Sequence, residues 1–491
     1  MGNPDDWIKY LWGLLLQPGT WAFLYLASEW VIRVLMVIVV PFRRTPDAAK
    51  GWLLLVFFLP LPAAGLYWLI GRAKYPEWRQ ERFGQLAEKL APLLDEASHH
   101  SVPMADLPDN FRPTAELARR LSTLPPVRGN RFELLANYDA SLARLVADID
   151  AASDHVHLLY YIFADDPAAM TVADALVRAA RRGVRCRVLY DALGSRSSAE
   201  VLKQHFAGAG VEARPVLPTG LIGRIRGRTA RADLRNHRKI AVIDGQIGYT
   251  GSQNLIDKAF KPHIVYEELV VRCEGPVVAQ LAAVHAADWF LETEEVLKDE
   301  VHPPEPHDDG ATAQVLPSGP DFDAPAIEQT VVDLIHAARK RVVMTTPYFI
   351  PNSAVLQALD TATYRGIEVH LVVSKKADQF LVAWAQKSYY TELLRSGTRI
   401  HRYRDKFLHA KHVSIDDAAV LIGSSNMDIR SFRLNAEVSL LAWDEGVAGQ
   451  LRKHQERYFA GSEELDLETW QKRPLWQKVI ENLARLVSPL L

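Results

Sequence analysis

The chain has 491 residues, of which 48% are hydrophobic and 24% charged, and its formal net charge is −2. This length leaves room for about three domains with sizeable cores. The composition excludes a disordered chain, a collagen-like repeat and a strongly basic protein that coats nucleic acid. The two cysteines, Cys186 and Cys273, are too few for a disulfide scaffold or a four-cysteine zinc site, and we expect them as reduced core thiols.

Two apolar segments stand near the N-terminus, at residues 21–40 and 52–70. Each is about 20 residues long, enough for a helix to cross a hydrocarbon core. The short connection between them holds two prolines, so we predict a hairpin of two transmembrane helices within an anchor of residues 1–75. Glu29 and Arg33 in the first segment are spaced i, i+4 on one helix face, so that they either neutralise each other against the partner helix or snorkel. A buried helix of a soluble domain is the alternative for either segment, and a cleaved signal peptide fits less well.

A hairpin leaves both chain ends on one side of the membrane. Five basic residues flank the hairpin on that side and three lie in its loop, which favours a cytoplasmic location for the remainder of the chain. The five are Lys9, Arg72, Lys74, Arg79 and Arg82, and the three are Arg43, Arg44 and Lys50.

From about residue 130, strand-like apolar runs alternate with amphipathic helical patterns, which is typical of an α/β fold. The first series is a strand at 155–163, a helix at 168–182 and a strand at 185–190. The second series has the same order: a strand at 341–350, a helix that ends at 364 and a strand at 367–373. This repetition indicates an internal duplication. We predict a connecting segment (76–130), a first half (131–300), a Pro-, Asp- and Gly-rich linker (301–323), a second half (324–468) and an amphipathic C-terminal segment (469–491).

The two halves agree best at a short motif, His-x-Lys-x4-Asp followed by Gly-Ser-x-Asn. A single match would be weak evidence, but two matches with identical spacing in a duplicated fold argue strongly against chance. The candidate residues are His237, Lys239, Asp244, Ser252 and Asn254 in the first copy, and His409, Lys411, Asp416, Ser424 and Asn426 in the second.

Residues i and i+2 of a strand point to the same face, so the His and Lys of each motif project together. Two copies face to face would place two imidazoles, two ammonium groups and two amides around one cleft. One neutral imidazole can attack phosphorus, and the other can donate a proton to the departing alkoxide. The lysines and asparagines would hold the non-bridging oxygens. We expect no metal and no cofactor, because the motif supplies Lys where a second metal ligand would stand.

The paired motifs resemble those of the phospholipase D superfamily, and the whole chain resembles the bacterial cardiolipin synthases within it. The resemblance includes GLYWLIGR at the end of the hairpin, YYIF, DALGS, LRNHRK, PYFIP and SYYTELLRSG. It implies two phospholipase D-like α-β-α sandwich halves that form one active site. It also implies His237 as the nucleophile and His409 as the acid/base, although the two roles are interchangeable on sequence grounds.

The resemblance further implies that an acidic residue downstream of each Gly-Ser-x-Asn orients a histidine. The candidates are Glu268 and Glu437, with Glu267 as the alternative in the first half. For Asp244 and Asp416, a structural role at a strand end competes with a catalytic one.

The stretch 214–239 holds eight basic residues against one acidic residue. It is longer than its second-half counterpart, with 27 residues from Gly210 to His237 against 12 from Gly397 to His409. We expect Arg224, Arg226 and Arg228 to attract anionic headgroups, with a solvated loop as the alternative. No aromatic interleaving suited to stacking bases accompanies the stretch, so nucleic acid is not an expected partner. The C-terminal segment either lies in the membrane interface or packs on the catalytic part.

The expected enzyme is a phosphatidyltransferase of the bacterial inner membrane that joins two phosphatidylglycerol molecules into cardiolipin and releases glycerol. The choice of acceptor rests on the resemblance, because the residues themselves indicate only a phosphodiester site beside a membrane. The alternatives are a phospholipase D-type hydrolase, a transphosphatidylase that uses another donor such as phosphatidylethanolamine, and a non-catalytic lipid-binding scaffold. The intact His and Lys pairs argue against the scaffold.

Overall fold

The structure is a computed structural model that describes residues 18–44, 46–71, 75–220, 223, 229–297 and 300–487. The chain divides into two compact units. The small unit comprises Met1–Ala73 and Leu486–Leu491, and the large unit comprises Lys74–Arg485.

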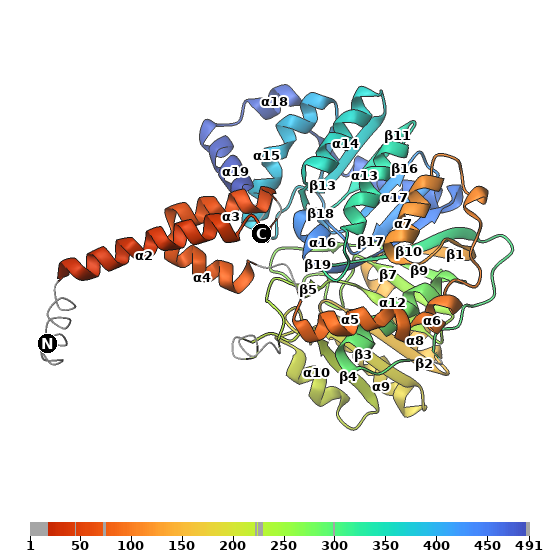
Figure 1. Ribbon diagram of the computed structural model, residues 1–491. Coiled ribbons are helices and arrows are strands. Elements are labelled where there is room, and N and C mark those ends of the chain that lie inside the picture. Colours follow the sequence, from red (N-terminus) through yellow and green to blue (C-terminus); the bar gives the residue numbers. More distant parts are fainter. Residues whose placement is uncertain are drawn as a thin grey trace, which may run out of the picture. The chain divides into compact units, whose positions relative to one another are not determined.

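The described residues of Met1–Ala73 form three helices, drawn from red to orange in Figure 1: α2 (Pro18–Val39), α3 (Pro46–Phe58) and α4 (Pro60–Ile70). Trp52 of α3 and Tyr67 of α4 pack edge to face, with ring centroids 5.1 Å apart. Arg33 and Glu29 form the expected ion pair at 3.2 Å. Within the described residues, α2 is the one helix both long and apolar enough to cross a membrane, with a mean hydropathy of 1.9 over Gly19–Val39.

The second predicted span is not one helix. It is interrupted at Leu59, between α3 and α4, which have 13 and 11 residues. Pro60 explains the break, because proline has no N–H to donate and disfavours a helical conformation in the residue before it. The two-helix transmembrane hairpin is therefore not confirmed.

The large unit is built on a 16-stranded sheet whose strands run in the order β20-β14-β13-β11-β16-β17-β19-β10-β1-β9-β7-β6-β2-β3-β4, with β5 paired to β19. Two-residue strands form two further pairs, β12 with β18 and β15 with β8. In the first part of the unit the strands are β1 (Val127–Leu135), β2 (His155–Tyr160), β3 (Arg185–Asp191), β4 (Val211–Val216), β5 (Arg235–Asn236), β6 (Ile240–Ile243), β7 (Ile247–Gly251), β8 (Tyr266–Glu267) and β9 (Val270–Glu274). In the second part they are β10 (Ala311–Ser318), β11 (Arg341–Thr345), β12 (Phe349–Ile350), β13 (Glu368–Ser374), β14 (Arg399–Tyr403), β15 (Phe407–Leu408), β16 (His412–Ile415), β17 (Ala419–Gly423), β18 (Met427–Asp428), β19 (Asn435–Trp443) and β20 (Ser462–Glu464).

The same strand pairing occurs twice. Strand β2 is parallel to β3, which is parallel to β4, and β2, β6, β7, β9 and β1 follow one another in antiparallel pairs. Strand β11 is likewise parallel to β13, which is parallel to β14, and β11, β16, β17, β19 and β10 are antiparallel in turn. The mixed α/β fold and its internal repeat therefore agree with the sequence patterns.

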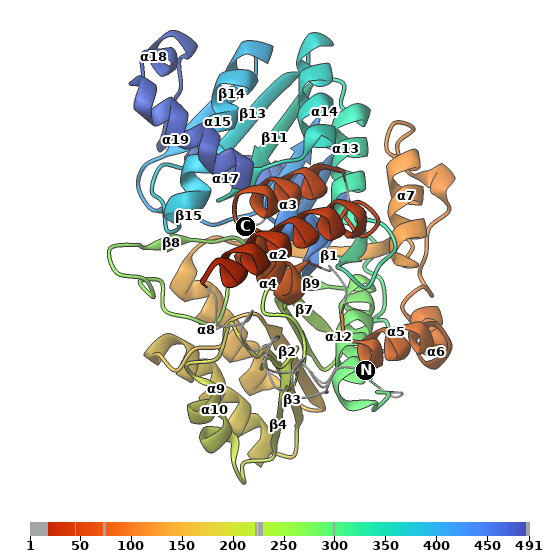
Figure 2. The same cartoon turned by 60° about the vertical axis from the view of Figure 1, so that its left-hand side comes forward.

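The helices of the large unit cover this sheet, with α8–α10 beside β2–β4 and α13–α15 beside β11–β14 (Figures 1 and 2). Asp166 and Asn352 cap α9 and α14 at corresponding places in the two repeats. The bounds are α5 (Glu77–Lys89), α6 (Ala91–Glu96), η1 (Met104–Asp106), α7 (Arg112–Ser122), α8 (Tyr138–Ala151), α9 (Pro167–Arg181), α10 (Ala199–Phe206), α12 (Val277–Thr293), α13 (Ala326–Ala337), α14 (Ser353–Tyr364), α15 (Phe380–Ser396), α16 (Ile429–Arg433), α17 (Glu445–Ala460), α18 (Leu467–Gln471) and α19 (Leu475–Val487).

Two sequence expectations differ from this fold. Residues 311–318, inside the predicted linker, form β10, which pairs with β1 on one side and with β19 on the other. The linker thus contains the strand that joins the two repeats into one sheet. The strands predicted over 155–163 and 341–350 end early, at Tyr160 and Thr345, because the following backbone bends to pair with the segments that carry the motif asparagines.

Candidate active site

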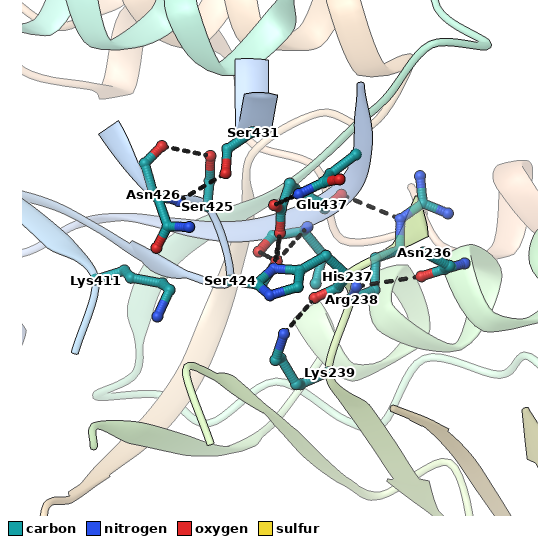
Figure 3. A network of polar contacts seen from close by, with 12 residues as sticks. Asn236, His237, Arg238, Lys239, Lys411, Ser424, Ser425, Asn426, Ser431 and Glu437 are labelled. Atoms are coloured by element: carbon teal, nitrogen blue, oxygen red, sulfur yellow. Dashed lines mark hydrogen bonds and ion pairs between the residues drawn. The ribbon is translucent and has the colours of Figure 1, made fainter. Parts of the chain in front are cut away.

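His237 is placed by a contact between the two repeats. It follows β5, which runs parallel to the start of β19 with Asn236 opposite Ala436. The His237 N–H donates to the Ala436 carbonyl at 2.8 Å. A segment of the first repeat is therefore held by backbone hydrogen bonds to the second, and Figure 3 shows the His237 ring directed at Glu437 of that repeat.

His409 is placed in the same way with the repeats reversed. It follows β15, which is parallel to β8 with Leu408 opposite Glu267. The His409 N–H donates to the Glu267 carbonyl at 2.8 Å. His237 therefore stands next to β19, which carries Glu437, and His409 stands next to β8, which Glu268 follows directly.

The two carboxylates contact the histidines across this boundary. Nδ1 of His237 lies 2.9 Å from Oε2 of Glu437, and Nδ1 of His409 lies 2.7 Å from Oε1 of Glu268. Ser424 donates its hydroxyl to Oε2 of Glu437 at 2.5 Å. Since both Nδ1 atoms are engaged by carboxylates, Nε2 is the nitrogen of each ring left for chemistry.

The two motif lysines are buried and make matching contacts. Nζ of Lys239 donates to the His237 carbonyl, and Nζ of Lys411 donates to the His409 carbonyl, each at 2.6 Å. Burial lowers the pKa of Lys239 to about 7 and that of Lys411 to about 8. Each ammonium also lowers the pKa of the histidine in the other repeat. All four side chains thus belong to one site, and Figure 3 shows Lys411 beside His237 and Lys239.

Burial also keeps the imidazoles neutral. It lowers the pKa of His237 to about 4 against the opposing effect of the Glu437 carboxylate, and it lowers the pKa of His409 in the same way. Burial alone would raise the pKa of Glu437 and Glu268, but their histidine partners hold both below the usual value. The carboxylates therefore favour the ionised form, and burial favours the neutral form of the rings, which is the nucleophilic state of an imidazole.

The motif asparagines and serines differ in what they offer a substrate. Oδ1 of Asn254 accepts from the Ile162 N–H at 3.2 Å, whereas the buried Oδ1 of Asn426 has no hydrogen-bond partner within the described residues. The Ser252 hydroxyl accepts from the Leu269 N–H at 3.0 Å. The hydroxyls of Ser252 and Ser424 are thus engaged with their own strands and with Glu437, so the amides are the better candidates for phosphate contacts.

Asp244 and Asp416 bind backbone at the strand starts. The carboxylate of Asp244 accepts from the N–H groups of Ser153, Asp154 and His155, the residues that lead into β2. The carboxylate of Asp416 accepts from the N–H groups of residues 339, 340 and 341, which lead into β11. These contacts favour the structural interpretation over the catalytic one.

The basic stretch before His237 is only partly described. Arg224, Arg226 and Arg228 lie outside the described residues. Three other arginines of the stretch are buried in ion pairs: Arg231 with Asp233, Arg235 with Asp191, and Arg238 with Asp288. Part of this positive charge therefore stabilises the fold instead of facing a ligand.

Two groups at the site were not singled out from the sequence. The ring of Tyr161, part of the YYIF segment, lies 4.8 Å from the His237 ring, and Nζ of Lys239 lies 5.4 Å from the same tyrosine ring. Asp191, part of the DALGS segment, accepts from the Asn236 N–H at 2.9 Å. Both segments are part of the family resemblance in the sequence, and this resemblance is the signal that points to them. Among the described residues, no group of three or more His, Cys, Asp or Glu side chains is placed to hold a metal ion.

Two His-x-Lys motifs that meet between the repeats of one α/β fold define a phospholipase D-like protein. The family model described as "Cardiolipin synthase, PLD-like domain" matches residues 145–289 and 331–459. The chain belongs to this family.

Curated relatives agree over nearly the whole length. Cardiolipin synthase A of Serratia proteamaculans is 36% identical over 466 residues, covering 91% of this chain and 94% of the relative. The enzyme of the same name from Edwardsiella ictaluri is 36% identical over 490 residues, covering 96% and 97%. In fold, the chain is similar to the crystal structure of phosphatidylserine synthase from Haemophilus influenzae, with a TM-score of 0.60 at 15% identity over 77% of this chain and 99% of that one.

Proposed function

We propose that the chain is a phosphatidyltransferase that converts two phosphatidylglycerol molecules into cardiolipin and glycerol. The observation that carries this proposal is the similarity to cardiolipin synthases along almost the full chain, the two motif regions included. The paired histidines, each held by a carboxylate, supply chemistry suited to exchange at a phosphodiester.

In the first step, Nε2 of His237 attacks the phosphorus of one phosphatidylglycerol. The P–N bond forms as the P–O bond to the headgroup glycerol breaks. His409 enters this step as the imidazolium, gives its Nε2 proton to that oxygen and becomes neutral. The product is a covalent phosphatidyl-histidine. In the second step, His409 takes a proton from a hydroxyl of the second phosphatidylglycerol, whose oxygen attacks phosphorus and releases His237. The near symmetry of the two His–Glu pairs also permits the reverse assignment of the histidines.

The remaining site residues support this exchange. Lys239, Lys411 and the amides of Asn254 and Asn426 hold the non-bridging oxygens while negative charge redistributes. Glu437 and Glu268 orient the histidines. Ser252 and Ser424 keep the carboxylate-bearing strands in place, while Asp244 and Asp416 hold the turns before β2 and β11. Arg224, Arg226 and Arg228, which lie outside the described residues, attract anionic headgroups.

The roles of these residues suggest a function for each domain. Residues 131–300 and 324–468 are two α-β-α sandwich halves that share the site. Residues 1–75 anchor the chain in the inner membrane, with α2 as one pass and the pair α3 and α4, kinked at Pro60, as the second. The catalytic part then faces the cytoplasm. The apolar outer surface of α2, where Phe23 is 69% exposed, supports a lipid environment.

The direct test is to incubate the detergent-solubilised full chain with phosphatidylglycerol and to quantify cardiolipin, phosphatidic acid and glycerol. We expect cardiolipin and glycerol in equal amounts. Phosphatidic acid as the sole lipid product would show a hydrolase instead.

Radiolabelled phosphatidylglycerol tests the intermediate. We expect a protein-bound label that is lost in His237→Ala and retained in His336→Ala, a control at an exposed histidine outside the motifs. A bound label that persists in His237→Ala but not in His409→Ala reverses the assignment of the two histidines.

A further inference from the structure

Helix α19 is packed with its polar face inward. Glu481 is 2% and Ala484 3% exposed, and both lie on the side that faces the rest of the large unit. Arg473 pairs with Glu481 at 2.8 Å, and Nζ of Lys478 donates to the Gln471 carbonyl at 2.6 Å. These two contacts lie within the C-terminal segment, and Arg485 joins the helix to α15, where it lies 3.4 Å from Glu392 and 4.2 Å from the Tyr389 ring centroid. Polar contacts therefore hold α19, where a surface helix ordinarily buries its apolar stripe.

The opposite face of α19 is apolar and exposed. Its members recur at helical spacing and include Trp476, which is 57% exposed, and Leu483, which is 56% exposed. The start of α15 extends this face, because the ring of Trp384 lies 6.1 Å from that of Trp476 and 5.3 Å from that of Phe380. We define the α15/α19 surface as Phe380, Leu381, Trp384, Leu475, Trp476, Val479, Ile480 and Leu483.

An exposed apolar surface of this extent indicates a docking site. Basic residues outnumber acidic ones around it. Lys387, Lys472, Arg473, Lys478 and Arg485 lie there against Glu392, Glu468 and Glu481, which pair with Arg485, Lys472 and Arg473 respectively. Nζ of Lys387 also lies 5.6 Å from the Trp384 ring.

An exposed apolar surface with basic residues around it favours one kind of occupant over others. Tryptophans flanked by Lys and Arg on an amphipathic helix suit the boundary between headgroups and acyl chains. An excess of positive charge attracts anionic lipid and repels a second copy of the same surface. We propose that the α15/α19 surface docks the large unit on an anionic phospholipid bilayer, with α19 lying in the interfacial plane.

Fluorescence quenching in the full chain tests the docking. Leu483→Cys is labelled with an environment-sensitive fluorophore and the protein is reconstituted into phosphatidylglycerol vesicles that contain brominated lipid. Cys186 and Cys273 are 2% and 0% exposed, so they do not compete for the label. The matched control is Val201→Cys, 43% exposed on α10, at the opposite end of the large unit from α18 in Figures 1 and 2.

We expect quenching at position 483 and none at position 201, with bromines near the glycerol backbone quenching more than bromines near the chain ends. No quenching at 483 overturns the proposal. Stronger quenching by the deep bromines also overturns it, because α19 would then lie among spanning segments. Disulfide-linked copies of Leu483→Cys without quenching would assign the surface to an interface between copies. Quenching and disulfide formation do not depend on turnover. A negative result in either of them therefore rejects the docking surface without rejecting the proposed reaction.

Activity gives a second measurement. Val479, Ile480 and Leu483 are replaced together by Gln, which removes exposed apolar side chains and leaves the buried side of α19 intact. We expect cardiolipin formation on vesicles to fall about tenfold and formation in mixed detergent micelles to stay unchanged. The control is Asn482→Gln on the same helix. Equal activity of the triple variant and the control on vesicles contradicts the proposal.

Discussion

Nδ1 of His237 lies 2.9 Å from Oε2 of Glu437, a residue 200 positions later in the chain and in the other repeat. The reciprocal pair, His409 and Glu268, is separated by 141 positions. Neither repeat therefore holds a complete histidine–carboxylate pair of its own. The site exists only when both repeats are folded against each other, which explains why β5 and β15 pair with strands of the opposite repeat.

Glu437→Gln tests the first pair. The carboxylate stabilises the imidazolium and so raises the pKa of His237, and its loss lowers this pKa further. Because the attacking imidazole must be neutral, the acidic limb of kcat/KM shifts to lower pH, while kcat falls by between about 10²- and 10⁴-fold because the ring loses its orientation. A pH profile of cardiolipin formation measures both effects. An acidic limb that moves to higher pH would contradict the assignment.

Glu268→Gln and Glu267→Gln separate the two acids that the sequence left open. Only Glu268 reaches His409, whereas Oε2 of Glu267 accepts from Lys406 at 2.6 Å. We expect a loss of between about 10²- and 10⁴-fold in kcat for Glu268→Gln and nearly normal turnover for Glu267→Gln. The reverse order in initial rates on phosphatidylglycerol would assign the orienting role to Glu267.

Lys411→Met removes one charge that faces the transferred phosphate. We expect kcat to fall about 10²- to 10³-fold, as for the loss of one oxyanion donor. The Lys411 ammonium lowers the pKa of Lys239, so its removal raises that pKa. The residual activity then extends to higher pH, because Lys239 keeps its proton there. Lys340→Met, at an exposed lysine, is the control, and an unchanged basic limb in Lys411→Met would mean that the two lysines are not coupled.

Asp244→Ala tests a structural role. The change leaves the N–H groups of Ser153, Asp154 and His155 without their acceptor, and it places alanine at a φ of 52°. Together these lower the free energy of unfolding by about 2–4 kcal/mol. We expect a lower thermal midpoint with normal kcat per folded molecule, against no change for Asp309→Ala at an exposed ion pair. Normal stability with lost turnover would instead make Asp244 catalytic.

Local patterns predicted much of this protein because they depend on neighbours in sequence. The i, i+2 spacing of His237 and Lys239 placed them on one side of the chain, and the repeated motif predicted a two-fold site. The alternation of strands and helices indicated the α/β fold. Pro60 was also visible in the sequence, and it carries the local reason for the break between α3 and α4.

The tertiary structure decided what depends on distant partners. Residues 311–318 look like part of a linker by composition, yet they form β10 because β1 and β19 offer it hydrogen bonds on both sides. The choice of Glu437 for His237 follows from the pairing of β5 with β19. The orientation of α19 depends on the contact of Arg485 with Glu392 on α15. The sequence by itself determined the His, Lys and Asn pairs of the two motifs, since their spacing along the chain repeats, but not the presence of Tyr161 and Asp191 at the site. Only long-range strand pairing, which spacing does not encode, decided which carboxylate holds which histidine.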